Sequence, residues 1–165
     1  MTAPSRDGFR VCVFEAARRM FALRLDLVRE AVPMAALARP PSMPAVLEGV
    51  LNLRGVAVPV MRLAFLLGLP QDALDLHTPL VVMRGPAPMA LLVHRIVGIA
   101  PVSGFVALPD AESLNGCVEG QLTIKGTTVQ LLAAPRLLLE KESRALAHFQ
   151  AAAETRLQHV EARAQ

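Results

Sequence analysis

An internal repeat constrains the fold of this chain more than any other feature. Residues 47–67, LEGVLNLRGVAVPVMRLAFLL, align with residues 118–138, VEGQLTIKGTTVQLLAAPRLL, at an offset of 71 positions. Both contain the pattern E-G-x-L-x-(L/I)-(R/K)-G in register, which chance matching in a leucine-rich chain does not produce. A weaker match, offset by 69 positions, joins residues 20–31 to residues 89–100. We therefore predict one structural unit of roughly seventy residues, used twice. Two such units side by side predict a cleft in which something binds.

The two units are expected to share an interface, because each half of a 165-residue chain would bury only a marginal core. Hydrophobic residues make up 53% of the chain, so some apolar surface is expected to meet partners. Apolar runs are broken before the roughly 18 residues that a membrane span needs. The first ten residues lack the apolar centre of a secretory signal. The cysteines, Cys12 and Cys117, form no CxxC spacing, and we expect a cytoplasmic protein with reduced thiols.

Most of the chain has the pattern of short strands separated by turns. Gly55 and Gly126 can adopt the positive φ that a tight hairpin requires. Residues 62–67 are predicted to form a short helix that Gly68 ends. Many short strands with frequent turns favour a mainly-β fold of small barrels. Strands are predicted at 9–15, 20–25, 27–32, 47–53, 56–61, 79–83, 89–94, 95–102, 114–124 and 127–132, with loops at 33–45 and 103–113.

The C-terminal segment has a different pattern. After Pro135 it contains no glycine and no further proline, and apolar residues recur every three or four positions from Leu146 to Val160. This period predicts a helix over about 135–162 with one apolar stripe. Such a helix either packs across the barrels or serves in docking or dimerisation, and the sequence leaves both interpretations open.

No pattern in the sequence predicts catalysis, a cofactor or a metal. Phosphate-binding and dinucleotide-binding glycine motifs are absent. The four histidines have no metal-ligand spacing, and Cys117 has no nearby base that would make it a nucleophile. Single-strand nucleic-acid binding needs aromatic platforms, but the chain has no Trp or Tyr, and of its six Phe only Phe105 lies in a predicted loop. Protein binding is the favoured class, and a nucleic-acid-binding β-barrel is the alternative from another class.

The run GVLNLRGVAVPVMRL, residues 49–63, resembles the signature of CheW, the coupling protein of bacterial chemotaxis. The family pattern reads roughly G-v-x-N-L-R-G-x-x-x-P-V-x-D-L. The resemblance continues in FALRLDLVREAV, ARPPSMPAVLEG, LVVMRGPAPMALLVHRIVGI and KGTTVQLLAAPRLL, and it covers about residues 9–140. It implies two five-stranded SH3-like β-barrels with a groove between them. We assign the halves to about 9–70 and 78–138, with a helical extension over 141–165.

The resemblance also implies a function. CheW-like proteins are non-enzymatic adaptors without a cofactor. They link the cytoplasmic tip of methyl-accepting chemoreceptors to a CheA-type histidine kinase, whose regulatory domain shares their fold. We therefore expect a chemotaxis scaffold. The same-fold alternative is a variant that binds only the receptor or only the kinase and acts as a cap or decoy.

The resemblance places candidate partner-binding residues at matching positions. Val28 and Glu30 match positions tied to receptor and kinase contacts, and Arg54 matches the signature arginine. Asn52 and Gly55 are expected to shape the turn that carries Arg54. Each has a simpler interpretation: Val28 as a core residue, Glu30 as a solvated charge, and Arg54 as a brace through a local salt bridge.

The chain departs from the family pattern at several acidic positions. Arg62 replaces the aspartate of PVxDL, His94 replaces the aspartate of the central strand pair, and Ala133 or Ala134 replaces an acid near the last helix. We include Arg62 and His94 among the partner-binding residues, because charge complementarity governs partner choice. An aspartate at position 62 would cap the following helix. From the sequence, Arg62→Asp is expected to stabilise the fold by up to about 1 kcal/mol.

Overall fold

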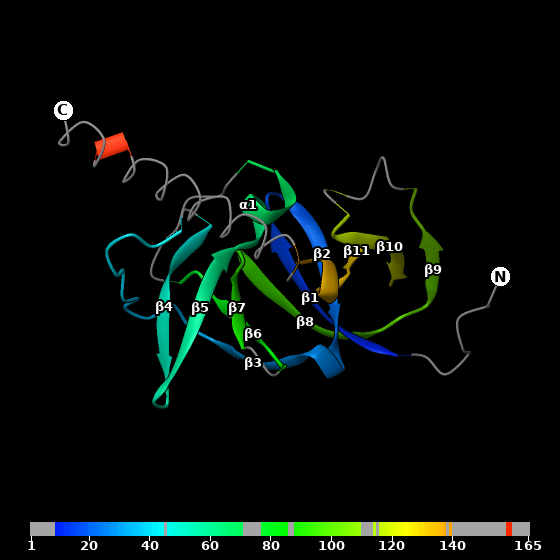
Figure 1. Ribbon diagram of the computed structural model, residues 1–165. Helices are drawn as coiled ribbons and strands as arrows, with labels where there is room; N and C mark the ends of the chain where they lie inside the picture. The colour runs from blue at the N-terminus through cyan, green and yellow to red at the C-terminus, as the bar shows by residue number, and fades with distance from the viewer. Residues whose placement is uncertain are drawn as a thin grey trace.

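The computed structural model describes residues 9–44, 46–70, 77–85, 88–109, 114, 116–137, 139 and 158–159 (Figure 1). Within these ranges the chain forms eleven strands, the short α-helix α1, one 3-10 turn and a further helical stretch at 134–137. The elements are β1 (Arg10–Ala16), β2 (Arg19–Arg24), η1 (Leu25–Leu27), β3 (Val28–Val32), β4 (Leu47–Leu53), β5 (Val56–Arg62), α1 (Leu63–Leu67), β6 (Leu80–Met83), β7 (Met89–Leu92), β8 (Arg95–Pro101), β9 (Gly104–Ala107), β10 (Val118–Ile124) and β11 (Thr127–Leu132).

The strands form two sheets, which confirms the predicted mainly-β fold. One sheet has six strands in the order β8-β1-β2-β11-β10-β9, and the other has five in the order β3-β6-β7-β5-β4. Figure 1 shows the five-stranded sheet on the left and the six-stranded sheet on the right. None of the helices in the described ranges has the length and apolar character that a membrane span requires.

The two sheets do not follow the two repeat units, because each sheet takes strands from both. The β1–β2 hairpin of the first unit joins β11 of the second in parallel, and β7 of the second unit joins β5 of the first in parallel. The order β8-β1-β2-β11-β10 is therefore the counterpart of β3-β6-β7-β5-β4. Neither segment, 9–70 or 78–138, builds a sheet from its own strands alone. This exchange of hairpins makes the two units one folded body.

The described residues form three apolar core clusters. One lies on the five-stranded sheet, one on the six-stranded sheet, and the largest contains residues of both sheets. Phe14 and Phe21 enter the largest cluster from the six-stranded sheet, while Met61 and Leu91 enter it from the five-stranded sheet, and all four are fully buried. The expected interface between the halves is thus part of the hydrophobic core.

The repeated E-G pairs lie at β-bulges. Pairing of β4 with β5 shifts register between Leu47 and Gly49, and pairing of β10 with β11 shifts between Val118 and Gly120. A Cβ at Gly120 would stand 2.3 Å from the ring of Phe105, so only glycine lets β9 approach β10 this closely. The repeated glycines therefore reflect backbone geometry.

The predicted loop at 103–113 is wrong in part, because Gly104–Ala107 forms β9 and pairs with β10. Phe105, predicted in that loop, lies in β9. The strand predicted at 114–124 begins only at Val118. Four residues are too few to show the alternation that predicts a strand. β9 can pair with β10 because Gly120 has no side chain and leaves room for it. Residues 110–113 lie outside the described residues.

Two further predictions concern helices. α1 ends as predicted, with Gly68 in the left-handed conformation at φ 69°. Residues 134–137, 139 and 158–159 are helical, in agreement with the predicted C-terminal helix at those positions. The remainder of that helix lies outside the described residues, and its role stays a prediction.

Candidate functional site

A groove of about 520 Å³ lies between strands β3 and β8. β3 ends the five-stranded sheet and β8 ends the six-stranded sheet, so the groove lies between two sheet edges. The two strands are also counterparts in the repeat, and a cleft between like units is therefore present. We call it the β3–β8 groove. Its lining includes Leu25, Val28, Glu30, Arg84, Ile96 and Ile99.

Val28 and Glu30 both line this groove from β3. Val28 is only 8% exposed and packs in the main core cluster, so the core interpretation holds alongside its place in the groove. Glu30 Oε1 accepts a hydrogen bond from Arg54 Nη2, and Arg29 Nε lies 3.9 Å from the same oxygen. Glu30 is thus held between two guanidinium groups at the edge of the groove.

The turn between β4 and β5 presents Arg54 to Glu30. Arg54 has φ 51° and Gly55 has φ 86°, the two positive values of a tight hairpin turn. Asn52 Oδ1 accepts a hydrogen bond of 2.9 Å from the Gly55 N–H, so both neighbours hold the turn in shape as expected. The Arg54 side chain remains 66% exposed while it braces Glu30. An ion pair this exposed adds at most about 1 kcal/mol, so it orients the side chains more than it stabilises the fold.

Arg62 and His94 do not line the groove. Arg62 Nε donates to Glu48 Oε2 at 2.5 Å, and Arg39 Nη2 donates to Glu48 Oε1 at 2.8 Å. Arg39 Nε also donates to the backbone oxygen of Glu48 at 3.0 Å. Glu48 is only 11% exposed, so two arginines neutralise a largely buried carboxylate. Arg62 forms no side-chain cap on α1, as predicted, but it has this intramolecular partner.

The second repeat unit lacks this arrangement. Glu119 is the counterpart of Glu48, and Ala133 stands where the first unit has Arg62. Burial raises the pKa of Glu119, and the charge of Arg24 lowers it in part. The exposed His94 makes a backbone contact, in which its N–H donates to the Glu15 oxygen at 2.8 Å. A role for Arg62 or His94 in partner binding stays a prediction.

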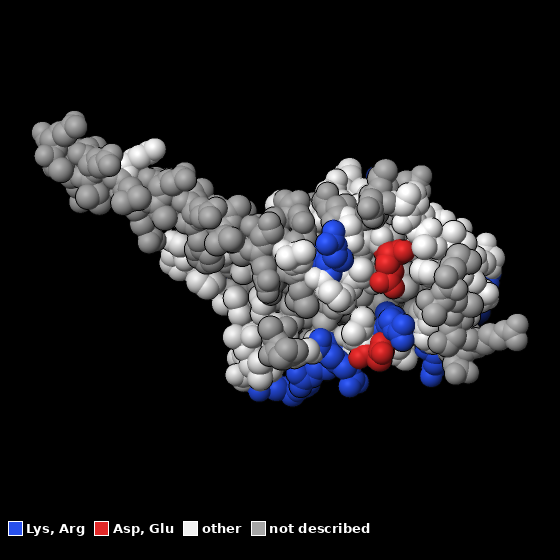
Figure 2. All heavy atoms as spheres, turned by 45° about the vertical axis from the view of Figure 1, so that its right-hand side comes forward, with Lys and Arg blue, Asp and Glu red and all other residues white. Residues whose placement is uncertain are grey.

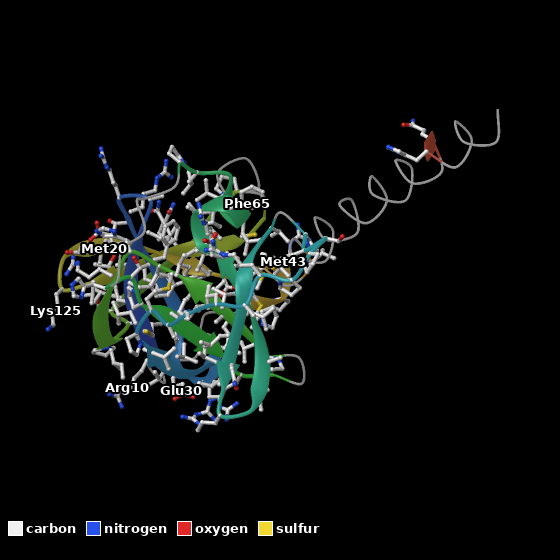
Figure 3. All side chains as sticks on the ribbon, turned by 90° about the vertical axis from the view of Figure 1, so that its left-hand side faces the viewer. Arg10, Met20, Glu30, Met43, Phe65 and Lys125 are labelled. Atoms are coloured by element: carbon white, nitrogen blue, oxygen red, sulfur yellow. The ribbon has the colours of Figure 1, made fainter. Side chains whose placement is uncertain are left out.

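The sequence did not single out two arginines of the groove, Arg29 and Arg84. Arg84 Nε donates to the Val28 oxygen at 3.1 Å, and its position follows from the pairing of β3 with β6. Arg84 is 56 positions from Val28, so no local signal could have found it. Figure 2 shows basic and acidic side chains close together on the lower part of one face. In Figure 3, Glu30 and Arg10 lie at the same lower end of the molecule, opposite Phe65.

The β3–β8 groove contains a buried thiol, apolar strand surface and charged side chains. Burial raises the pKa of the Cys12 thiol in the groove, which disfavours the reactive thiolate. Within the described ranges, no group of three or more His, Cys, Asp or Glu side chains could hold a metal ion. What the groove offers is apolar strand surface bordered by charges of both signs.

Comparisons with known proteins agree with this arrangement. The chemotaxis protein CheW of Thermotoga maritima is 27% identical over 101 residues, which cover 61% of this chain and 67% of that protein. The crystal structure of the scaffolding protein TtCheW from Thermoanaerobacter tengcongensis superposes with a TM-score of 0.70 at 20% identity. That superposition covers 76% of this chain and 89% of the other and shows a shared fold. The family described as the CheW-like domain matches residues 10–142, and the chain therefore belongs to the CheW-like family of chemotaxis scaffold proteins.

Proposed function

We propose that this protein is a non-enzymatic adaptor that joins the cytoplasmic tip of a chemoreceptor to the regulatory domain of a CheA-type histidine kinase. Membership of the CheW-like family supports a scaffold role. The observation that carries the proposal is the β3–β8 groove, where Val28 and the paired Glu30 meet at the junction of the two sheets.

We expect an amphipathic helix as the partner segment in the groove. Its wall is apolar, with Leu25, Val28 and Ile96 contributing to the lining. Its rim carries Glu30 between arginines, and charge at a rim selects among partners more than it adds affinity. A helix from a receptor tip would place apolar residues at every third or fourth position on this wall. The side chains of Arg54 and Glu30 would then pair with opposite charges that flank the apolar stripe of the helix.

The test distinguishes two roles of the Glu30–Arg54 pair: an internal ion pair that supports the fold, and a direct contact with a partner. Purified receptor-tip fragment and kinase regulatory domain are titrated separately into the protein by calorimetry. Glu30→Arg or Arg54→Glu is expected to weaken binding by about tenfold, as expected for loss of a well-placed charged contact. The double variant with exchanged charges should recover the ion pair and the melting temperature but not the binding.

The Glu15–Arg95 pair supplies a matched control. Its Nη2–Oε2 distance is 2.9 Å, and its side chains are 25% and 60% exposed, close to the 27% and 66% of Glu30 and Arg54. Exchanging its charges should leave both affinities unchanged. Binding of neither fragment would refute the adaptor role, and binding of one alone would establish the cap or decoy alternative.

A further inference from the structure

A second apolar recess lies within the six-stranded sheet. It has a volume of about 260 Å³, and its lining includes Val13, Met20, Val97, Gly98, Ile124 and Lys125. This is smaller than the roughly 300–1,000 Å³ of sites for small molecules, so it fits one or two amino-acid side chains. Lys125 is the one charged side chain among the described residues that line it. Figure 3 shows Met20 and Lys125 on the same side of the molecule.

The repeat reveals what this recess lacks. β3 and β8 each contain one extra residue at a bulge, Arg29 in β3 and Val97 in β8. Aligning the two bulges places Gly98 where β3 has Glu30, one position away from the match found in the sequence. Lys125 is the counterpart of Arg54 in the repeated hairpin, and its φ of 49° is nearly the same as the 51° of Arg54.

In the first hairpin, therefore, the basic residue pairs with Glu30 across the end of the barrel. In the second, the position of the carboxylate is occupied by Gly98, which has no side chain. Lys125 forms no ion pair with any carboxylate among the described residues. The recess lies beside this unpaired cation.

The apolar surface around the recess is unusually exposed. Val97 is 49% exposed and Ile99 is 55% exposed, although both belong to a strand. Exposed apolar side chains bordered by a cation complement an apolar group that carries a negative charge.

We propose that this recess binds an acidic segment of a partner protein, in which a carboxylate flanked by large aliphatic side chains supplies the charge that Glu30 supplies in the other barrel. The aliphatic side chain fills the recess and the carboxylate pairs with Lys125. The site is distinct from the β3–β8 groove, although Gly98 and Ile99 line both. The proposal does not depend on the identity of the partners given above.

The test uses two matched probes, N-acetyl-Leu-Glu-Leu-amide and N-acetyl-Leu-Lys-Leu-amide, titrated into the isotope-labelled full chain and followed by NMR. We expect the glutamate peptide to shift the amide resonances of residues 97–100 and 124–129 in a saturable manner. The lysine peptide should bind at least about tenfold more weakly, because the cation would repel it.

Two variants and one control complete the experiment. Val97→Glu alters a residue that lines the recess and not the groove, and it should weaken binding of the glutamate peptide by about tenfold or more. Val106→Glu makes the same change at a 66% exposed valine of β9 outside the recess, and it should leave binding unchanged. Lys125→Glu should reverse the preference toward the lysine peptide, and it decides the matter if Val97→Glu does not fold.

Several results would overturn the proposal. These are equal binding of the two peptides, shifts confined to residues 28–31 of the groove, or equal loss in the Val97 and Val106 variants. Glu30→Arg distinguishes this proposal from the adaptor role. It should impair partner binding at the groove and leave peptide binding at the recess intact.

Discussion

Replacing Arg62 by aspartate should destabilise the protein, although aspartate is the better helix cap. In the structure, Arg62 Nε donates to Glu48 Oε2 at 2.5 Å, and Glu48 is only 11% exposed. The substitution removes one of two arginines that neutralise this carboxylate and places a second carboxylate near it. Only Arg39 then remains as an ionic partner of Glu48 among the described residues.

The expected magnitude follows from two opposing contributions. A hydrogen bond to a charged group contributes about 1.5–3 kcal/mol net, and the 34% exposure of Arg62 favours the lower end of this range. The aspartate cap returns at most about 1 kcal/mol, and α1 has only five residues to benefit from it. The variant should therefore lose about 1 kcal/mol of unfolding free energy, which lowers the melting temperature by roughly 2–4 °C.

Urea unfolding of a double-mutant cycle tests this reasoning. In a Glu48→Gln background the buried charge is gone, and Arg62→Asp should there be neutral or stabilising by up to about 1 kcal/mol. The sign of the effect thus depends on Glu48. A higher melting temperature for Arg62→Asp in the unmodified protein, or equal effects in both backgrounds, would refute the argument.

Three further predictions concern stability. Gly120→Ala should cost about 1–3 kcal/mol in urea unfolding because its Cβ would meet β9, whereas Gly104→Ala, whose nearest contact is 3.7 Å, should cost less than about 1 kcal/mol. The β1–β2 turn has φ of 50° at Ala17 and 61° at Arg18, so the double change Ala17→Asn and Arg18→Gly should raise the free energy of unfolding by about 1 kcal/mol; no gain would mean that the turn is not strained. Burial raises the pKa of Glu119 in the folded state, so this carboxyl stabilises the fold at low pH and loses that contribution as pH rises through the raised pKa. Glu119→Gln should therefore gain stability relative to the parent between about pH 4 and pH 7, and a constant difference in thermal melts would contradict the pKa direction.

Much of the fold could be predicted because its signals are local. A basic residue followed by glycine predicts each of the repeated hairpins. Gly68 predicts the end of α1. The β9 strand could not be predicted, because its four residues are held by close approach to Gly120, which lies sixteen positions from Gly104 in the chain. When a residue far away in the chain sets the boundary of a strand, a short stretch of sequence contains no signal for that boundary.

For the candidate site, too, some residues could be predicted from the sequence and others could not. The family pattern pointed to Glu30 and Arg54, and the sequence allowed a local salt bridge for Arg54 without naming its partner, which in the structure is Glu30. The partner of Arg62 was missed, because β4 and β5 must pair before Glu48 lies beside it. That tertiary contact reverses the expected sign of a substitution at position 62.

Three properties could be inferred from the amino-acid sequence without coordinates: one unit is used twice, the units are β-rich, and each carries the same hairpin. These properties follow from periodicity and glycine placement, which act over a few residues. Three others became visible in the folded chain: the units exchange their first hairpins, β3 and β8 border one groove, and Gly98 stands opposite Lys125 where the first unit has an ion pair. The reason is physical: strand pairing and bulge register are set by contacts between residues far apart in the chain, and a one-residue shift changes which side chains meet.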